Sequence, residues 1–408
     1  MLNSIINYFT QNNHILSFLG ILLFLFTAFI FSNNKRKINW LKILNAFIMQ
    51  VILAFFILKT QIGSRIFMIL ADIFVLLYKF ADSGIGFLFG SLANQSDSWG
   101  FIFVIKVLPV LIFLSSLMSI MFHFGVIQFL VKIISYTIRP ILGTSGVETL
   151  CVAANSMVGP TGAPLLVKKY IKHLTKSEIM VLMVSGMATI NAASLAIYGS
   201  MGVSILHMLV ASIMSIPGVL LISKILVPET ESPQTVAGNK IEMPRDSSNV
   251  LDAITIGAID GLKLAASVSA ILLAFISLMA MTDYILLNTI GYSLNFIFSK
   301  IFYQIATLLG VEVQDRAVAG ALLGQKLVIN EFIAYAAFVK SALSEHSRII
   351  LTYALCGFSN FSVIGMLIGA IAVLAPEKRT ILTKLGLRAL LGATLVNLLN
   401  AAIASLLI

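Results

Sequence analysis

The stretch AVAGALLGQKLVINEFIAYAAFVK, residues 317–340, has the length of a membrane-spanning helix but carries Lys326, Asn330 and Glu331 in its middle. A charged side chain at the centre of a bilayer costs about 3 kcal/mol on insertion scales, so such residues face a protein interior or a water-filled cavity. We therefore predict that residues 316–344 form a re-entrant hairpin with a functional tip.

A second stretch, GTSGVETLCVAANSMVGPTGAPLLVKKY at residues 143–170, is interrupted after Asn155 by GPTGAP, residues 159–164. Glycine and proline break a helix, and within a membrane the freed backbone groups are tolerated only where protein or a water-filled cavity satisfies them. We predict a second re-entrant hairpin over residues 143–171.

Composition places the whole chain in a membrane. Of its 408 residues 59% are hydrophobic and 11% are charged, whereas soluble domains carry about 25% charged residues. The net charge of +10 comes from short basic clusters between apolar runs, a distribution typical of the positive-inside rule rather than of nucleic-acid binding.

These runs predict an all-α polytopic membrane protein with eight transmembrane helices. They lie near residues 14–32, 43–59, 101–122, 177–202, 205–227, 262–283, 349–374 and 386–408. The N-terminus is taken to be outside, and both hairpins are taken to enter the membrane and return on the side from which they entered. The basic clusters at 35–37, 168–176 and 378–388 are then cytoplasmic. Segments 61–90, 125–140 and 249–261 are mixed in character and are predicted to be interfacial helices.

The chain divides into four parts. We predict N-terminal helices over residues 1–94, a first core half over 95–227, a polar cytoplasmic loop over 228–249, and a second core half over 250–408. Each hairpin is followed by an apolar helix that small polar residues interrupt, near Thr189 and near Asn360. Since the charge argument gives the halves opposite orientations, they form an inverted repeat, the pattern of secondary transporters with a midplane binding site.

Glu331 is the residue that suggests the most chemistry. Its carboxylate can pair with Lys326, accept hydrogen bonds from the hydroxyls of a polar solute, or carry a coupling proton. Asn330 and Asn360 supply amide groups of the kind that hold a sugar.

A second group can hold a monovalent cation. Asn155 and Thr189 offer side-chain oxygens, and the interrupted backbone near Val158 and Ile190 offers carbonyls, which together suit sodium. A helix-breaking polar cluster without an ion is the alternative.

The sequence favours no enzyme. Cys151 and Cys356 lie far apart in apolar surroundings, and we find no Walker loop, zinc spacing or catalytic triad order.

Residues 324–335, GQKLVINEFIAY, resemble the signature G-x-K-x-x-x-N-E-F-V-A-(Y/F/M) of concentrative nucleoside transporters, with Ile333 in place of Val. The likeness extends over roughly residues 95–408 through the stretches at 155–164, 187–190, 354–360 and 374–379.

This resemblance implies a homotrimer in which each protomer has its own pathway. It implies that Glu331 and Asn360 hold the ribose hydroxyls, and that a sodium ion lies against Asn155, Val158, Thr189 and Ile190.

The base-reading residues differ from the family pattern. Where the family has G-Q-T-E-A-P, this chain has GPTGAP, so Pro160 and Gly162 replace an amide and a carboxylate, while Thr161 is kept. Loss of these hydrogen-bonding groups is expected to relax or redirect base selectivity. A ribose-contacting Ser is replaced by Val363, next to Ser362, and Ser194 stands where a small apolar residue lines the base, with Asn191 nearby.

We therefore expect a cation-coupled, most simply sodium-coupled, symporter that imports nucleosides by alternating access, in the inner (cytoplasmic) membrane of a bacterium. The alternatives are the same fold carrying a modified nucleoside, a nucleotide-like or another ribosylated solute, with proton coupling as a variant, and a non-transporting receptor or scaffold. A passive channel is a poor match, because hairpins that close on a midplane site suit alternating access better than an open pore. The expected partners are a nucleoside or nucleoside-like molecule and the lipid bilayer, not nucleic acid.

Overall fold

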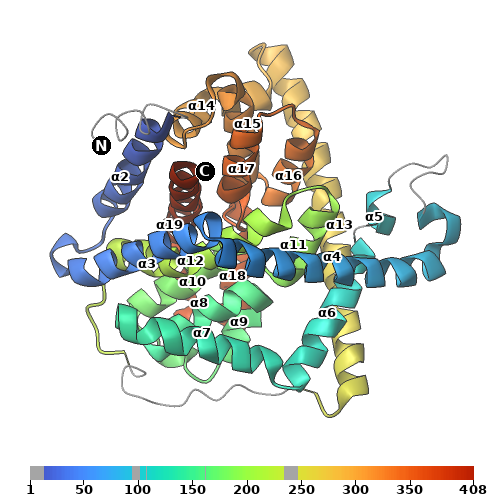
Figure 1. The fold of residues 1–408 in the computed structure, drawn as a ribbon, viewed down its shortest axis with the longest axis horizontal. Coiled ribbons are helices and arrows are strands. Elements are labelled where there is room, and N and C mark those ends of the chain that lie inside the picture. The colour runs from blue at the N-terminus through green and yellow to red at the C-terminus, as the bar shows by residue number, and fades with distance from the viewer. Residues whose placement is uncertain (1–12, 94–101, 107, 161, 234–246) are drawn as a thin grey trace.

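The structure is a computed structural model that describes residues 13–93, 102–106, 108–160, 162–233 and 247–408, and within these residues every regular element is a helix (Figure 1). The elements before the polar loop are α2 (His14–Ile30), η2 (Lys35–Lys37), α3 (Trp40–Lys59), α4 (Gln61–Phe89), η3 (Gly90–Ala93), α5 (Phe103–Lys106), α6 (Leu108–His123), α7 (Val126–Leu142), α8 (Gly146–Val158), α9 (Gly162–Leu166), η4 (Ile171–His173), α10 (Lys176–Ala188), α11 (Ala192–Ser200) and α12 (Ile205–Leu226). Those after it are α13 (Val250–Thr289), α14 (Leu294–Leu308), η5 (Val313–Asp315), α15 (Arg316–Val328), α16 (Glu331–Lys340), α17 (Glu345–Leu355), α18 (Phe361–Leu374), η6 (Pro376–Lys378) and α19 (Arg379–Leu407).

Six helices in the described part are long and apolar enough to cross a membrane, and a seventh span results if a pair bent by 90°, residues 276–289 and 294–308, is counted as one. Two shorter apolar helices, α2 and α18, add to this set. The predicted number of eight transmembrane helices and the orientation of the hairpins stay predictions.

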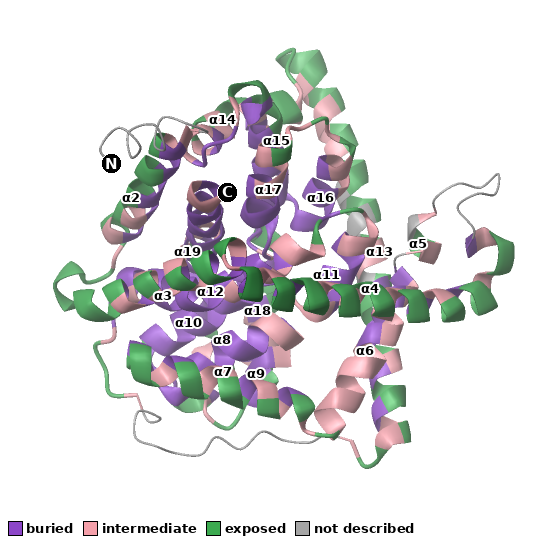
Figure 2. Ribbon diagram, in the orientation of Figure 1, coloured by how far each residue is buried: buried purple, intermediate pink, exposed green. Residues whose placement is uncertain are grey.

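The buried core includes three helices of the set that is long enough to cross a membrane. Figure 2 shows burial concentrated in α10, α12 and α19, whose spanning windows are 72–78% buried, whereas those of α3 and the first part of α13 are 28% and 24% buried. Because the outer helices expose large apolar side chains such as Leu41, Phe87 and Leu273, their surface suits lipid or a second protein copy rather than water.

Both predicted hairpins are pairs of helices joined at a break. In the first, α8 ends at Val158 and α9 begins at Gly162, and Gly159 takes a left-handed conformation with φ 87°. In the second, α15 ends at Val328 and α16 begins at Glu331. The helices that follow are also broken, between α10 and α11 and between α17 and α18, at the small polar residues that mark the repeat in the sequence.

One predicted element is wrong in its bounds. Residues 249–261 do not form a separate interfacial helix, because α13 runs without interruption over 40 residues from Val250 to Thr289. Its glycines serve close packing: a Cβ at Gly257 would lie 2.6 Å from Ser115 O, and one at Gly261 would lie 2.6 Å from Ile112 Cα. These glycines let α13 lie directly against α6.

The base of the first hairpin is anchored by two matching helix caps. Ser145 with Glu148 caps α8 and Thr175 with Glu178 caps α10, each as a reciprocal capping box. The Ser145 hydroxyl also donates to Glu178 Oε1 at 2.6 Å. Lys224 of α12 donates to Glu148 Oε1, so the hairpin is attached to the buried core at its root.

Candidate functional site

A cavity of about 540 Å³ lies where the first hairpin tip, α11, and the starts of α16 and α18 meet, with α6 and α13 as the facing wall. Sites for small molecules typically measure about 300–1,000 Å³. Of the residues predicted to bind substrate, those that line this one cavity are Gly162, Ser194, Asn330, Glu331, Asn360, Ser362 and Val363. Thr161 lies outside the described residues.

Three asparagines cap the half-helices that begin at the cavity. Asn191 caps α11, Asn330 caps α16 and Asn360 caps α18, each with its side-chain oxygen accepting a backbone N–H of its own helix. An N-cap asparagine satisfies one of the orphan donors of a helix start. The breaks in the sequence therefore place three helix N-termini, which favour negative charge, around one site.

Glu331 is the first residue of α16 and is 6% exposed. The Tyr198 hydroxyl donates to its Oε1 at 2.9 Å, and Asn360 Nδ2 donates to its Oε2 at 3.0 Å. A carboxylate has about four acceptor positions, so these two bonds fix its orientation and leave about two positions for a ligand.

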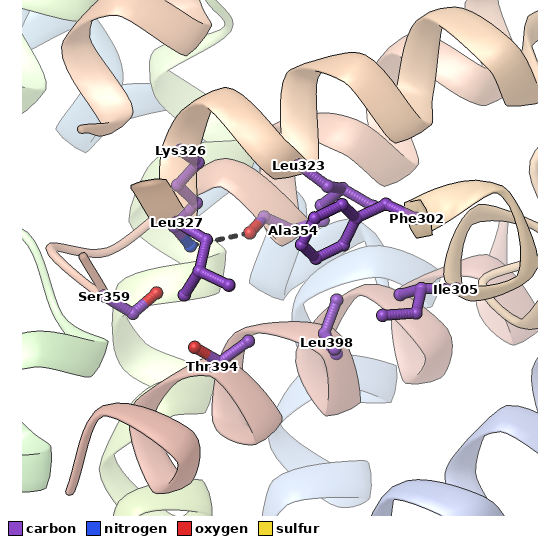
Figure 3. Close-up of a pocket in the computed structure, with 9 residues that line it drawn as sticks. All are labelled: Phe302, Ile305, Leu323, Lys326, Leu327, Ala354, Ser359, Thr394 and Leu398. Carbon is purple, nitrogen blue, oxygen red and sulfur yellow. Dashed lines mark hydrogen bonds between the residues drawn. The ribbon is translucent and has the colours of Figure 1, made fainter. Parts of the chain in front are cut away.

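Lys326 is not paired with Glu331, and no ion pair between them occurs among the described residues. Its Nζ donates instead to Ala354 O and to Asn397 Oδ1, both at 2.8 Å, and Figure 3 shows its bond to Ala354. The carboxylate is therefore held by neutral donors, and the reading of Glu331 as half of a structural ion pair finds no support in this geometry.

The buried Asn397 of α19 forms hydrogen bonds to both broken helices, at the end of α10 and in the segment between α17 and α18. Its Nδ2 donates to the carbonyl of Ala188, the last residue of α10, at 2.8 Å, while its Oδ1 accepts from Lys326 and from Ser359. A small cavity of about 20 Å³ lies beside this cluster. Figure 3 shows the side chains that line it, among them Phe302, Leu327 and Thr394. This space suits about one water molecule rather than a solute.

The residues predicted to hold sodium meet one test that the structure offers. Asn155 Oδ1 is buried and has no hydrogen-bond partner, while its Nδ2 donates to Ser185 Oγ of α10 at 2.7 Å. Thr189 donates to Ser185 O at 2.8 Å, which leaves its oxygen lone pairs free to accept. Val158 and Ile190 lie at the ends of interrupted helices, where carbonyls lack intrahelical partners. An orphaned amide oxygen beside such carbonyls fits a monovalent cation.

Two residues of the site were missed by sequence reasoning. Tyr198 lies one helical turn after Ser194 on α11, so the i, i+4 spacing was the available signal, but an apolar helix carries many such aromatic residues. Asn397 lies in an apolar stretch of α19 with no local motif, and its role follows only from the approach of α10 and α15.

Comparison with known proteins agrees with this geometry. Family profiles match most of the chain: "Na+ dependent nucleoside transporter N-terminus" over residues 19–92, "Nucleoside recognition" over 104–205 and "Na+ dependent nucleoside transporter C-terminus" over 207–405. An uncharacterized transporter of Haemophilus influenzae is 38% identical and the nucleoside permease NupC of Helicobacter pylori is 36% identical, each alignment covering 96% of this chain and 97% of the relative.

A solved structure shows the same fold. The structure of CNTnw in an inward-facing substrate-bound state superimposes with a TM-score of 0.93 and 36% identity, covering 96% of this chain and 98% of that one. The expected all-α membrane fold and the resemblance found in the sequence are thereby confirmed. The chain belongs to the concentrative nucleoside transporter family, a family of membrane transporters and not of enzymes.

Proposed function

We propose that this protein is a sodium-coupled symporter that imports nucleosides through the cavity around Glu331. The observation that supports this most is the Glu331 carboxylate, which two neutral donors orient while about two acceptor positions stay open. Vicinal ribose hydroxyls are suitable donors for those positions. Movement of the hairpin-bearing unit against α6 and α13 then exposes the cavity to each side in turn.

Nucleobase selectivity is expected to differ from that of relatives with an amide and a carboxylate at the hairpin tip. Pro160 and Gly162 both line the cavity, and neither has a side-chain hydrogen-bonding group. A pocket that recognises a base edge by hydrogen bonds rejects wrong bases strongly, and one that lacks those groups does so less.

Sodium is the coupling ion that the donor groups suit best. Asn155, Val158, Thr189 and Ile190 would hold it, and the ion supplies positive charge for carbonyls at two helix ends. Asn155 lies on the first hairpin and is hydrogen-bonded to Ser185 of α10. A bound sodium ion would therefore hold the hairpin against α10, in the arrangement that forms the nucleoside cavity. Binding of ion and nucleoside are then coupled, each strengthening the other.

A homotrimer in a bacterial inner membrane is the assembly that family membership supports. The 40-residue α13 and its neighbour α6 carry the wall of the cavity that faces the hairpins, so they suit a fixed scaffold between protomers. The exposed apolar side chains of α4 suit the lipid bilayer.

A modified nucleoside is the second candidate substrate, since the altered tip and the large cavity leave room for a bulkier base. Among the described residues that line the cavity, Glu331 and Asp260 are acidic and none is a lysine or arginine. Asparagine side chains already cap the three helix N-termini, and no lysine or arginine of the described lining balances these two carboxylates. A phosphate group would therefore bind unfavourably here, which disfavours nucleotide-like solutes. In a variant of this candidate, a proton carried by Glu331 replaces sodium as the coupling ion. A receptor or scaffold role is disfavoured, because neither needs a held carboxylate inside a cavity.

Thermal stabilisation of the detergent-solubilised protein tests the proposal, because a ligand that binds the folded state raises its apparent stability. We expect several nucleosides, but not free nucleobases, to raise the unfolding temperature, and more so with sodium than with choline. If a lower pH strengthens this stabilisation in the absence of sodium, the coupling ion is a proton and not sodium. If no nucleoside raises the unfolding temperature of the folded protein, the result contradicts nucleoside transport.

A further inference from the structure

The three capping asparagines around the cavity share one orientation. In each of Asn191, Asn330 and Asn360 the side-chain oxygen accepts a backbone N–H of the helix that it caps, at 2.8, 2.9 and 3.1 Å. A backbone N–H can only donate, so this bond determines which end of the amide is the oxygen. The amide nitrogen, a pure donor, is therefore the group left for other partners. For Asn360 that partner is Glu331.

Asn191 has no such partner. Its Nδ2 donates to none of the described residues, and the side chain lines the cavity at the start of α11. The buried neighbour Ala193 and the half-buried Ser194 belong to the same wall. Two N–H groups of the Asn191 amide thus stay without a partner among the described residues, in a side chain that lines the cavity.

Asn191 also lies directly against the altered hairpin tip. A Cβ atom added to Gly159 would come within 2.8 Å of Asn191 Nδ2 and 3.1 Å of its Cβ, so the tip backbone packs onto this amide. The adjoining Pro160 and Gly162, which line the same cavity, contribute no side-chain donor or acceptor. The tip therefore lacks an amide of its own, and Asn191 of α11 supplies one directly beside it.

We propose that Asn191 reads the nucleobase by donating to the carbonyl oxygen at position 4 of a pyrimidine or position 6 of a purine. The protein then prefers nucleosides with a keto group at that position over the matching bases with an amino group there. This inference rests on the proposed nucleoside transport and specifies its substrate class. With ribose on Glu331, the cavity lining from α11 and the first hairpin is left to contact the base.

The chemistry separates closely matched bases. Uracil and cytosine, like hypoxanthine and adenine, differ where one presents a carbonyl oxygen and the other an amino group. A carbonyl accepts from Asn191 Nδ2, whereas an amino group meets another donor and leaves both groups unpaired. The Ser194 hydroxyl, which can donate or accept, has no hydrogen-bond partner among the described residues and adapts to either base.

The test compares these matched pairs in the whole protein at saturating sodium. Binding of uridine, cytidine, inosine and adenosine is measured by isothermal titration in detergent. We expect uridine to bind about tenfold more tightly than cytidine, and inosine about tenfold more tightly than adenosine, the ratio that one unpaired buried polar group produces. Equal affinities within both pairs, or tighter binding of cytidine and adenosine, would overturn the inference.

The variant Asn191→Asp sharpens the test. Aspartate caps a helix about as well as asparagine, so α11 keeps its start, but the outward group changes from a donor to an acceptor. We expect the preference to invert toward cytidine and adenosine. Asn191→Ser, which keeps a capping oxygen but no longer reaches the base, should reduce both ratios to about one. The control is Asn39→Asp, an exposed cap at the start of α3, which should leave the ratios unchanged.

These outcomes separate the inference from the function on which it rests. Wild-type protein that binds all four nucleosides with equal affinity, or an Asn191→Asp variant with the wild-type ratios, overturns the role of Asn191 while nucleoside binding stands. Wild-type protein that is folded and binds none of the four overturns the proposed function and this inference with it.

Discussion

The Tyr198 hydroxyl lies 2.9 Å from Glu331 Oε1 and donates a hydrogen bond to it. Tyr198 belongs to α11 in the first half of the chain and Glu331 begins α16 in the second half. The Tyr198 ring also packs on the Tyr335 ring with centroids 4.7 Å apart. The carboxylate in the cavity is therefore positioned by contacts between the halves, not by its own hairpin alone.

Replacing this tyrosine tests the positioning role. Tyr198→Phe keeps the ring packing and removes one hydrogen bond to a charged group, worth about 1.5–3 kcal/mol. We expect nucleoside affinity to fall roughly tenfold or more, because the carboxylate is no longer held in one orientation. Binding titrations check this, and Tyr335→Phe serves as the control, since its hydroxyl donates to Thr352 O instead. Unchanged affinity in Tyr198→Phe would contradict the role.

The orphaned oxygen of Asn155 gives a prediction for sodium. Asn155→Leu removes this oxygen at nearly constant size, so the sodium concentration for half-maximal stabilisation should rise at least tenfold, about 1.4 kcal/mol of lost binding. Ser185→Ala removes the partner of Asn155 Nδ2 and a bond to Leu182 O but keeps the Asn155 oxygen, so it should change sodium affinity less. Thermal unfolding at increasing sodium concentration measures both. A wild-type sodium response in Asn155→Leu would place the ion elsewhere.

The Asn397 cluster predicts a stability difference between two neighbouring positions of α19. Asn397→Leu leaves Lys326 and Ser359 without their shared acceptor and should lower the free energy of unfolding by about 3 kcal/mol or more. Thr394→Val should be neutral or stabilising, because Thr394 Oγ1 is buried without a partner. Denaturation in detergent compares the two variants. Equal stability of the two would show that the cluster contributes nothing.

Lys224 and Lys263 form a second contrast. Glu148, the partner of Lys224, has a side chain 1% exposed, whereas the Lys263 and Asp260 side chains are 74% and 65% exposed and lie 3.6 Å apart. Lys224→Met should cost about 3–5 kcal/mol, because it leaves a buried carboxylate uncompensated. Lys263→Met should cost less than about 1 kcal/mol. Thermal unfolding of both variants checks the order, and a reversal would show that the hairpin root is not anchored by charge.

Much of the site was predictable because its residues are costly in a membrane. Glu331, Asn330 and Asn360 stand out in apolar runs, and the Gly-Pro pattern of residues 159–164 marks a broken helix without any three-dimensional information. The structure gathers these residues around one cavity.

Other features depend on contacts that no local pattern encodes. The mixed character of residues 249–261 suggested a separate interfacial helix, yet Gly257 and Gly261 are where α6 and α13 approach closely, which only the packed pair explains. Tyr198 and Asn397 are ordinary residues of apolar helices until distant elements bring Glu331 and Lys326 beside them. The direction of the Asn191 amide follows from its cap, which requires the exact start of α11.

Uptake into proteoliposomes tests the central claim most directly. Labelled uridine is offered to wild-type protein and to Glu331→Gln, which preserves size but removes the carboxylate, with an inward sodium gradient or with choline. We expect wild-type protein to accumulate uridine above its external concentration only with the sodium gradient, and Glu331→Gln to reduce the initial rate at least 100-fold, roughly 2.7 kcal/mol. Wild-type accumulation that ignores sodium, or full uptake by a folded Glu331→Gln protein, would contradict sodium-coupled transport through this cavity.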